Sequence, residues 1–133
     1  MSGAAHRMSL RVYYEDTDLA GIVYYANYLK FIERGRTEYV REIGVDQTKL
    51  KAETGIVFAV RRVEADYIAP AKFDDVLGVV TSVERASGVR LVMRQVVERG
   101  GEVLFEALVT LVALTESGAP ARLPAEIRQA FDG

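Results

Sequence analysis

The chain has 133 residues, of which 50% are hydrophobic and 27% are charged, so it is long enough and apolar enough to bury the core of one domain. Its net charge of −2 argues against nucleic-acid binding driven by charge. The absence of cysteine excludes disulfides and thiolate metal sites, and the single histidine, His6, supplies no cluster of metal ligands. We therefore expect one domain over residues 1–133, with no metal and no nucleic-acid partner.

The start of the chain lacks the features of a targeting segment. Residues 1–9 contain no apolar core of the kind that a signal peptide requires, and no apolar run approaches the length of a membrane span. The sequence therefore predicts a soluble, cytoplasmic protein without a membrane span, in which residues 1–8 form a flexible tail.

A strand, a loop and a long helix are predicted for the first third of the chain. Apolar and polar residues alternate over Met8–Tyr14, which is typical of a strand, and a loop follows over Glu15–Gly21. Over Tyr24–Ile43 the apolar period becomes helical, in a stripe that also contains Arg36. Gly35 lies inside this helix, where it indicates either close packing on a sheet or an incidental glycine.

The rest of the chain is mostly β in character. A short helix is expected over 46–53, strands over 56–69, 75–86, 89–99 and 102–115, hairpin turns at 87–88 and 100–101, and a last helix over 124–131. The run Val103–Leu114 is almost continuously apolar, which predicts a central strand covered on both sides. One helix covers one face only, so the other face needs further cover, such as a second subunit. The predicted fold class is α+β, with a long helix against an antiparallel sheet of about five strands.

Three acidic residues, Glu15, Asp16 and Asp18, crowd the loop before the long helix. Acids favour such positions because they cap free N–H groups and meet the positive end of the helix dipole. An aspartate there is equally suited to act as nucleophile or general base on a carbonyl, with the N–H groups of the first helical turn stabilising the oxyanion. The residues alone leave both interpretations open.

Other residues around this loop also have two interpretations. Gly21 either makes a plain turn or lets a ligand approach the backbone. The aromatic residues Tyr24, Tyr25 and Tyr28 form either core or the wall of an apolar pocket, and Glu33 is either a solvated charge or a second carboxylate of a site. The sequence contains no Walker-type phosphate loop, no dinucleotide-binding glycine motif and no serine-hydrolase elbow.

Several segments resemble a known family. Residues 14–28 read YEDTDLAGIVYYANY, and residues 31–34 read FIER. Together they closely resemble the signature of the 4-hydroxybenzoyl-CoA thioesterase family, and within it the Tol–Pal-associated acyl-CoA thioesterases. The segments DYIAPA (66–71), FDDVL (73–77) and ARLP (121–124) extend the resemblance over residues 10–131.

The resemblance implies a hotdog fold, in which a curved antiparallel sheet wraps around the long helix. It also implies homodimers joined sheet edge to sheet edge, commonly paired into homotetramers, with active sites at the subunit interface. Members of the family hydrolyse acyl-CoA thioesters to a free acid and CoA without a metal or redox cofactor. The partners that it implies are an acyl-CoA substrate and, as an alternative acyl donor, an acyl carrier protein.

The resemblance also assigns site residues by position. Asp18 matches the catalytic aspartate, which either attacks the thioester carbonyl or activates water. The backbone N–H of Tyr25 matches the donor to the thioester oxygen, in the first turn of the helix, and Gly21 shapes the loop. Asp16 receives no catalytic role. The substrate-binding residues around this centre are Tyr24, Asn27 and Tyr28, of which Tyr24 and Asn27 also fix the turn. Glu33 is a further candidate, as a second carboxylate, from its position on the helix and not from the resemblance.

The chain departs from its nearest relatives in two places. The Tol–Pal-associated members usually have histidine at the position of Tyr25, and tyrosine does not replace histidine as an acid or base near neutral pH, although a backbone N–H role survives. The hairpin over 85–90 lacks the dense basic cluster with which some relatives hold the CoA phosphates. Ser87, Arg90 and Arg122 remain as candidates for that role.

Two further functions compete with an acyl-CoA thioesterase. The chain could be a non-catalytic module that binds acyl-CoA or acyl carrier protein, an alternative motivated by the missing histidine at position 25. It could also be a structural partner of the Tol–Pal cell-envelope machinery, which rests on family association alone.

Overall fold

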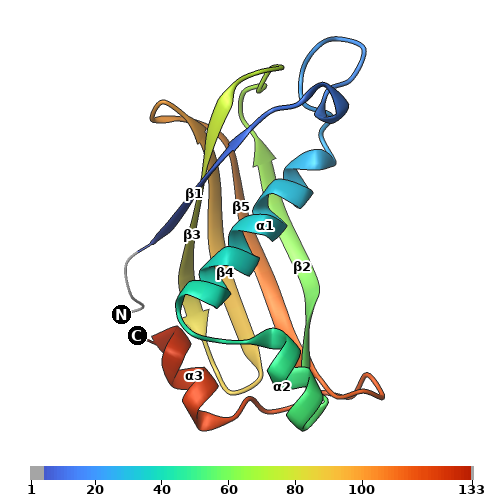
Figure 1. Cartoon of the computed structure of the whole chain (residues 1–133), viewed down its shortest axis with the longest axis vertical. Coiled ribbons are helices and arrows are strands. Elements are labelled where there is room, and N and C mark those ends of the chain that lie inside the picture. The colour runs from blue at the N-terminus through green and yellow to red at the C-terminus, as the bar shows by residue number, and fades with distance from the viewer. Residues whose placement is uncertain (1–4, 133) are drawn as a thin grey trace.

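A computed structural model describes residues 5–132, in which a long helix lies against one five-stranded antiparallel sheet (Figure 1). This arrangement confirms the predicted α+β class. The strands are β1 His6–Arg11, β2 Val57–Tyr67, β3 Val76–Ala86, β4 Arg90–Arg99 and β5 Glu102–Leu114. The helices are α1 Asn27–Glu42, α2 Gln47–Thr54 and α3 Ala125–Asp132, and a single 3₁₀ turn covers Tyr14–Asp16.

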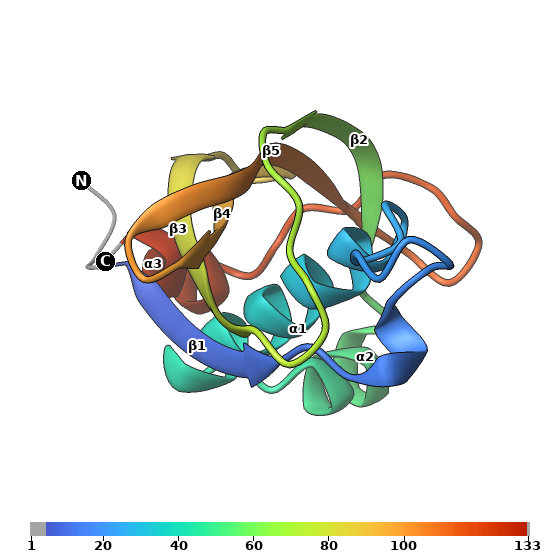
Figure 2. The ribbon, with the colours of Figure 1, turned by 90° about the horizontal axis from the view of Figure 1, so that it is seen from above.

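The sheet has the strand order β1-β3-β4-β5-β2 and curves around α1 (Figure 2). The middle strand is therefore β4, and the prediction that the apolar run Val103–Leu114 is the central strand was wrong by one position. β5 is paired on both edges, but along it buried side chains alternate with partly exposed ones. The outer face of β5 is thus not covered within residues 5–132. Its apolar side chains on that face stay partly exposed, so the apolar run does not require a helix on both sides of the sheet.

The first two elements begin at different residues from those predicted. β1 starts at His6, where it pairs with Thr81 of β3, so residues 6–8 belong to the sheet and not to a tail. The remainder of the predicted tail, residues 1–4, lies outside the described residues. α1 starts at Asn27, three residues later than predicted, because the N–H of Asn27 bonds to the Tyr24 carbonyl oxygen in a tight turn (2.8 Å).

Gly35 marks the place where α1 packs most tightly on the sheet. A Cβ at this position would lie 2.6 Å from Cγ1 of Val79 and 3.0 Å from Oγ1 of Thr81, both on β3. The buried amide of Gln95 on β4 donates to the Ile32 carbonyl oxygen of α1 (2.7 Å) and to the Thr81 hydroxyl (2.9 Å). The close-packing interpretation of Gly35 is therefore correct, and a buried polar contact anchors the helix at the same level.

The two short helices close one end of the molecule. The Asp46 side chain accepts from the Lys49 N–H (3.0 Å), which caps α2. Phe131 of α3 is buried and packs edge to face on Phe58 of β2. No helix within residues 5–132 is long and apolar enough to cross a membrane.

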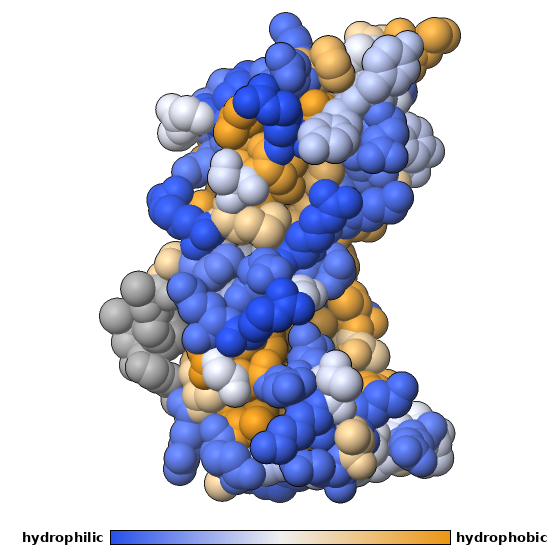
Figure 3. Space-filling view, viewed as in Figure 1, coloured by the Kyte–Doolittle hydropathy of each residue, from blue (hydrophilic) through white to orange (hydrophobic). Residues whose placement is uncertain are grey.

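Apolar side chains on the surface gather in separate patches, and Figure 3 shows a hydrophilic band between those of the upper and lower halves. Several exposed apolar residues belong to the loop before α1, among them Tyr14, Leu19 and Tyr25. Others belong to β2, which is an edge strand of 11 residues paired with β5. These two regions hold most of the large apolar side chains that are exposed in residues 5–132.

Candidate active site

The loop that leads into α1 is a short antiparallel hairpin. Thr17 and Val23 form an isolated β-bridge, and the Asp18 N–H donates to the Ile22 carbonyl oxygen (2.9 Å). One step nearer the helix, the Tyr24 N–H donates to the Asp16 carbonyl oxygen (2.9 Å). Backbone hydrogen bonds therefore fix the path of the loop from residue 16 to residue 24.

Asp18 begins the turn at the tip of this hairpin. The Gly21 N–H donates to the Asp18 carbonyl oxygen (3.0 Å), and the Ala20 N–H donates to Oδ1 of the Asp18 carboxylate (2.9 Å). Gly21 has φ +80°, which a residue with a Cβ adopts only with strain. The carboxylate is thus held at an exposed position by its own turn, and Gly21 is required by the backbone geometry.

The second acid of the loop, Asp16, has a structural role. Its carboxylate accepts from the Tyr13 N–H (2.8 Å), and its carbonyl oxygen accepts from the side-chain amide of Asn27 (2.9 Å). Asn27 therefore ties the start of α1 to the loop, which agrees with its expected part in fixing the turn. The three acids are not interchangeable, because Asp18 is the one whose carboxylate is held at the tip of the turn.

Tyr25 lies in the turn just ahead of α1, and not in the first helical turn as predicted. Its backbone N–H has no hydrogen-bond acceptor within residues 5–132, so it remains available as a donor. Its ring is exposed and packs edge to face on Tyr67 of β2 (6.0 Å between centroids) and against Tyr24 (5.0 Å). The aromatic rings therefore line the surface beside the free donor.

Tyr28 belongs to the core, which corrects its prediction as a substrate-binding residue. Its ring is 3% exposed and stacks on Phe105 of β5 (4.9 Å between centroids). Its hydroxyl accepts from the Ala71 N–H (3.0 Å). Burial raises the pKa of Tyr28, and the hydrogen bond from Ala71 opposes this only in part. Tyr28 thus links the core to Ala71, whose carbonyl oxygen in turn accepts from Val23 of the loop.

The segment 70–75 lies beside the loop and is hydrogen-bonded to it. The Val23 N–H donates to the Ala71 carbonyl oxygen (2.8 Å). Asp75 accepts from the Lys72 N–H (2.8 Å) and from the Arg99 guanidinium (2.7 Å). Burial would raise the pKa of Asp75, but the hydrogen bonds from Lys72 and Arg99 outweigh it, so the pKa is lowered. This ion pair keeps the supporting segment in place.

Glu33 does not lie at the loop. It is eight residues beyond Tyr25 on α1, about 12 Å along a helix axis at 1.5 Å per residue. Its carboxylate accepts from the Thr37 hydroxyl (2.5 Å), and it lines a groove between α1, β2 and α3. Within one copy of the chain, Glu33 is therefore not a second carboxylate beside Asp18.

The residues predicted to hold the CoA phosphates meet at the hairpin between β3 and β4. The Ser87 hydroxyl accepts from the Arg90 N–H (3.1 Å), so it stabilises the turn, and the Arg122 guanidinium packs against Gly88. Ser87 and Arg90 line a cleft of about 250 Å³ on the outer face of the sheet. Two further arginines line this cleft, Arg62, which is ion-paired with Glu64 of the same cleft, and Arg85. No short motif marks them, because they come from different strands.

The two clusters lie at opposite ends of β3. The loop contacts the beginning of this strand, where the Val12 N–H donates to the Asp75 carbonyl oxygen (2.9 Å), and the hairpin follows its end at Ala86. The ten steps along its eleven residues, at about 3.3 Å each, separate the clusters by roughly 33 Å. The structure thus brings Asp18, Gly21, Tyr24, Tyr25 and Asn27 together at one end, and Ser87, Arg90 and Arg122 at the other.

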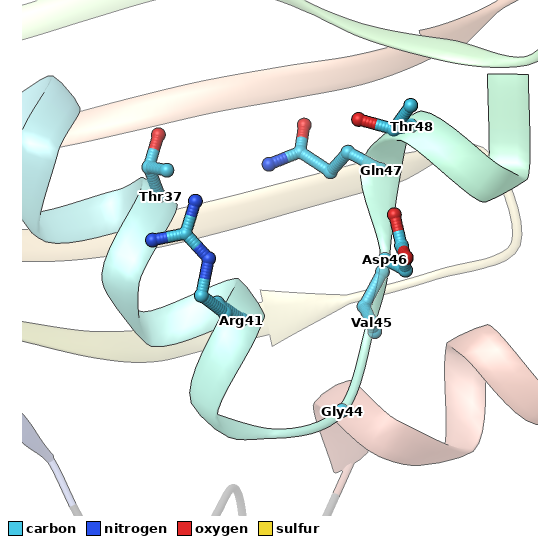
Figure 4. A pocket seen from close by; sticks show the side chains of 7 residues that line it. All are labelled: Thr37, Arg41, Gly44, Val45, Asp46, Gln47 and Thr48. Carbon is cyan, nitrogen blue, oxygen red and sulfur yellow. The ribbon is translucent and has the colours of Figure 1, made fainter.

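A further pocket of about 390 Å³ lies at the corner between α1 and α2 (Figure 4). Its charged groups already have partners, since Arg41 donates to both oxygens of Glu38 and Asp46 caps α2. None of the predicted site residues lines it. Among the residues that the structure describes, no three potential metal ligands of the His, Cys, Asp or Glu type lie together.

Comparison with known proteins identifies the class. A model of the Thioesterase superfamily matches residues 20–106, a span that begins just after Asp18. Acyl-CoA thioesterase YbgC of Haemophilus influenzae is 41% identical over 124 residues, which cover 92% of this chain and 90% of that protein. The crystal structure of a probable thioesterase from Bartonella henselae is 39% identical, with a TM-score of 0.87 over 91% of this chain and 100% of that one. The chain therefore belongs to the Thioesterase superfamily.

The fold agrees with this membership. A 4-hydroxybenzoyl-CoA thioesterase crystallised with 4-hydroxybenzoyl-CoA shares only 23% identity with this chain. Its TM-score is nevertheless 0.90, over 97% of this chain and 99% of that one. The expected hotdog fold is thereby confirmed.

Proposed function

We propose that the protein is an acyl-CoA thioesterase that hydrolyses its substrate to a free acid and CoA. The observation that carries this proposal is the loop before α1, where an exposed aspartate carboxylate and an unpartnered backbone N–H are presented by the same backbone hairpin. Relatives that are named acyl-CoA thioesterases and match nearly the whole chain support the choice of substrate.

In this mechanism the Tyr25 N–H donates to the thioester oxygen and stabilises the negative charge that develops there. The Asp18 carboxylate acts in one of two ways. As a general base it takes a proton from water, whose oxygen then attacks the carbonyl carbon. As a nucleophile it attacks that carbon itself, forming a mixed anhydride that water hydrolyses. In both routes the C–S bond breaks and CoA leaves as a thiol. Hydrolysis involves no net oxidation or reduction, so we propose that no cofactor takes part.

A dimer paired through β2 would complete the substrate site. β2 is an edge strand with exposed apolar side chains, Val60 and Tyr67 among them, which is a surface suited to strand pairing. A two-fold axis between two antiparallel β2 strands would bring the loop end of one copy beside the hairpin end of the other. Arg90 and Arg122 of one copy would then approach the Asp18 loop of its partner, where we propose that they hold the CoA phosphates.

The acyl donor and location follow from the same proposal. We propose acyl-CoA as the substrate, with acyl carrier protein as an alternative donor, because both present the same thioester. CoA thioesters are intracellular metabolites, which favours a cytoplasmic enzyme. A non-catalytic binding module remains the second candidate, and turnover separates it from an enzyme.

The test is Asp18→Asn, which keeps the side-chain shape and the oxygen that accepts from Ala20 but removes the negative charge. We expect kcat/KM to fall by roughly 10²–10⁴-fold on a panel of acyl-CoAs, as is typical for loss of a general base or nucleophile. Free-thiol release is the measurement, and Glu15→Gln in the same loop is the matched control. Full turnover by Asp18→Asn would overturn the assignment of Asp18, and binding without turnover by the unmodified protein would favour the binding module.

A further inference from the structure

A guanidinium lies in the apolar stripe of α1. Arg36 is partly buried on the face of the helix that also carries Ile32 and Tyr39, both in the core. Its Nη1 donates to the side-chain oxygen of Gln95 (3.0 Å), which is the one hydrogen bond of this side chain within residues 5–132. A guanidinium has five N–H donors, so most of its capacity is unused.

Arg36 also lacks a counter-ion. Arg94 is ion-paired with Glu106 and Arg99 with Asp75, whereas Arg36 forms no ion pair with any described carboxylate. Burial lowers the pKa of Arg36, and Glu33 opposes this from a distance. Because a partly buried cation is costly without an anion, an anionic ligand beside Arg36 would be stabilised.

The Arg36 side chain lines a groove of about 250 Å³ between α1, the start of β2, and α3. Its walls are mostly apolar, and they include Val40, Phe58, Val60, Leu91, Leu111 and Phe131. The volume holds roughly eight groups the size of a water molecule, at about 30 Å³ each. Thr37 and Gln47 line both this groove and the corner pocket of Figure 4, so the groove continues toward the surface between α1 and α2.

We propose that this groove binds a short apolar chain that ends in a carboxylate, with Arg36 as the counter-ion. The apolar walls account for the chain, and the unused N–H donors of a planar guanidinium match a carboxylate in charge and geometry. Glu33 also lines the groove, but its carboxylate accepts from the Thr37 hydroxyl and the residue is exposed, so Arg36 is the more buried of the two charged groups.

The carboxylate has two possible sources with the same chemistry. One is a free acid, such as the product of hydrolysis. The other is the distal carboxylate of the acyl group of a substrate. This second source rests on the proposed function and on pairing through β2, because that pairing would bring the groove of one copy toward the Asp18 loop of the other. Binding of a free acid does not depend on catalysis, so the two proposals fail separately.

The first experiment measures binding of octanoate and of 1-octanol to the full chain by calorimetry, in the unmodified protein and in Asp18→Asn. We expect octanoate to bind at least about ten-fold more tightly than the neutral alcohol, because its carboxylate forms charge-assisted hydrogen bonds. Arg36→Met should lose this preference, whereas Arg34→Met, an exposed arginine of the same helix, should keep it. Equal affinities for acid and alcohol in the unmodified protein, which requires no variant to fold, would overturn the proposal.

The second experiment identifies the source by comparing hydrolysis of adipoyl-CoA and hexanoyl-CoA, which differ in one distal carboxylate. If the acyl group supplies the carboxylate, the ratio of the two kcat/KM values should fall about ten-fold in Arg36→Met. If the ratio is unchanged while octanoate binding is lost, the occupant is a free acid. Retention of both octanoate preference and substrate ratio in Arg36→Met overturns the proposal for either source.

Discussion

The beginning and the middle of α1 are built in opposite ways. At its beginning, the loop from Asp16 to Asn27 is exposed and is held by hydrogen bonds to its own backbone. In its middle, Gly35 sits against β3, and a fully buried glutamine, Gln95, fastens the helix to the sheet. The first region presents polar groups to solvent, and the second removes them from it.

The loop therefore presents the groups proposed for catalysis, whereas the middle of the helix contributes to the stability of the fold. A carboxylate that is to react must stay accessible, so burial cannot fix its position and the backbone of a tight turn does so instead. The contacts of Gly35 and Gln95 in the middle of α1 fix the position of the helix on the sheet. They thereby also fix the place where the preceding loop joins the helix. Substitutions at these contacts should therefore cost stability, and substitutions in the loop should cost activity first.

The largest effect on stability is expected for Gly35→Ala. The new methyl group would lie 2.6 Å from Cγ1 of Val79 in a packed layer, where overpacking costs about 1–3 kcal/mol. Alanine favours a helix over glycine by up to about 1 kcal/mol, so we expect a net loss of about 1–2 kcal/mol. Urea unfolding measures it, with Arg34→Ala on the exposed face as the control. A variant more stable than the parent would show that α1 moves freely on the sheet.

A smaller loss of stability, with a larger loss of activity, is expected for Asn27→Ala. The lost hydrogen bond to the Asp16 carbonyl oxygen contributes about 0.5–1.5 kcal/mol to the free energy of unfolding. Release of the loop should lower kcat roughly 10- to 100-fold, because misplaced catalytic groups react slowly. The measurements are steady-state kinetics and urea unfolding, with Asn27→Gln, which keeps a side-chain amide donor, as a partial rescue. A change in KM with kcat intact would contradict a positioning role.

The smallest effect is expected for Asp75→Asn, behind the loop. The pKa of Asp75 is lowered below its ordinary value of 3.8 in the folded protein, so the unfolded chain binds more protons. Its stabilising contribution is therefore present above about pH 4 and is lost as the pH falls through the folded-state pKa. Because the pair is partly exposed, we expect less than about 1 kcal/mol.

Urea midpoints between pH 7 and pH 3 test this expectation. Asp75→Asn should flatten the acidic part of the profile, and Asp74→Asn, at the neighbouring exposed acid, is the matched control. An unchanged slope in Asp75→Asn would show that the ion pair with Arg99 does not support the segment behind the loop.

Most of the fold could be predicted from the sequence, because its elements have clear periods. The helical stripe of α1 and the alternation in β3 and β4 come directly from which faces are buried. The boundaries were less accurate. Tyr24 and Tyr25 fit the helical stripe, yet they form a turn, because backbone bonds within the loop hold them out of the helix.

The candidate site could be predicted only where residues are close in sequence. Asp18, Gly21 and Tyr25 fall within eight residues and so form a recognisable segment. Arg62 and Arg85 come from separate strands and meet only in the folded sheet. Arg36 was visible as a charge in an apolar stripe, but its missing counter-ion could not be inferred, because ion pairing depends on which side chains the fold brings near. Tyr28 shows the reverse case, since its sequence left core and pocket wall open and its buried ring places it in the core.

The turn at Asp18 has a stereochemical consequence. A free carboxylate has two equivalent oxygens, but here Oδ1 accepts from the Ala20 N–H, and Oδ2 has no partner within residues 5–132. The group is therefore no longer symmetric, and its rotation is restrained by the tether. In the proposed mechanism, Oδ2 is therefore the oxygen that would meet a water molecule or a carbonyl carbon. Glutamate would keep the charge at this position, but its extra methylene would misplace the oxygen that the tether holds.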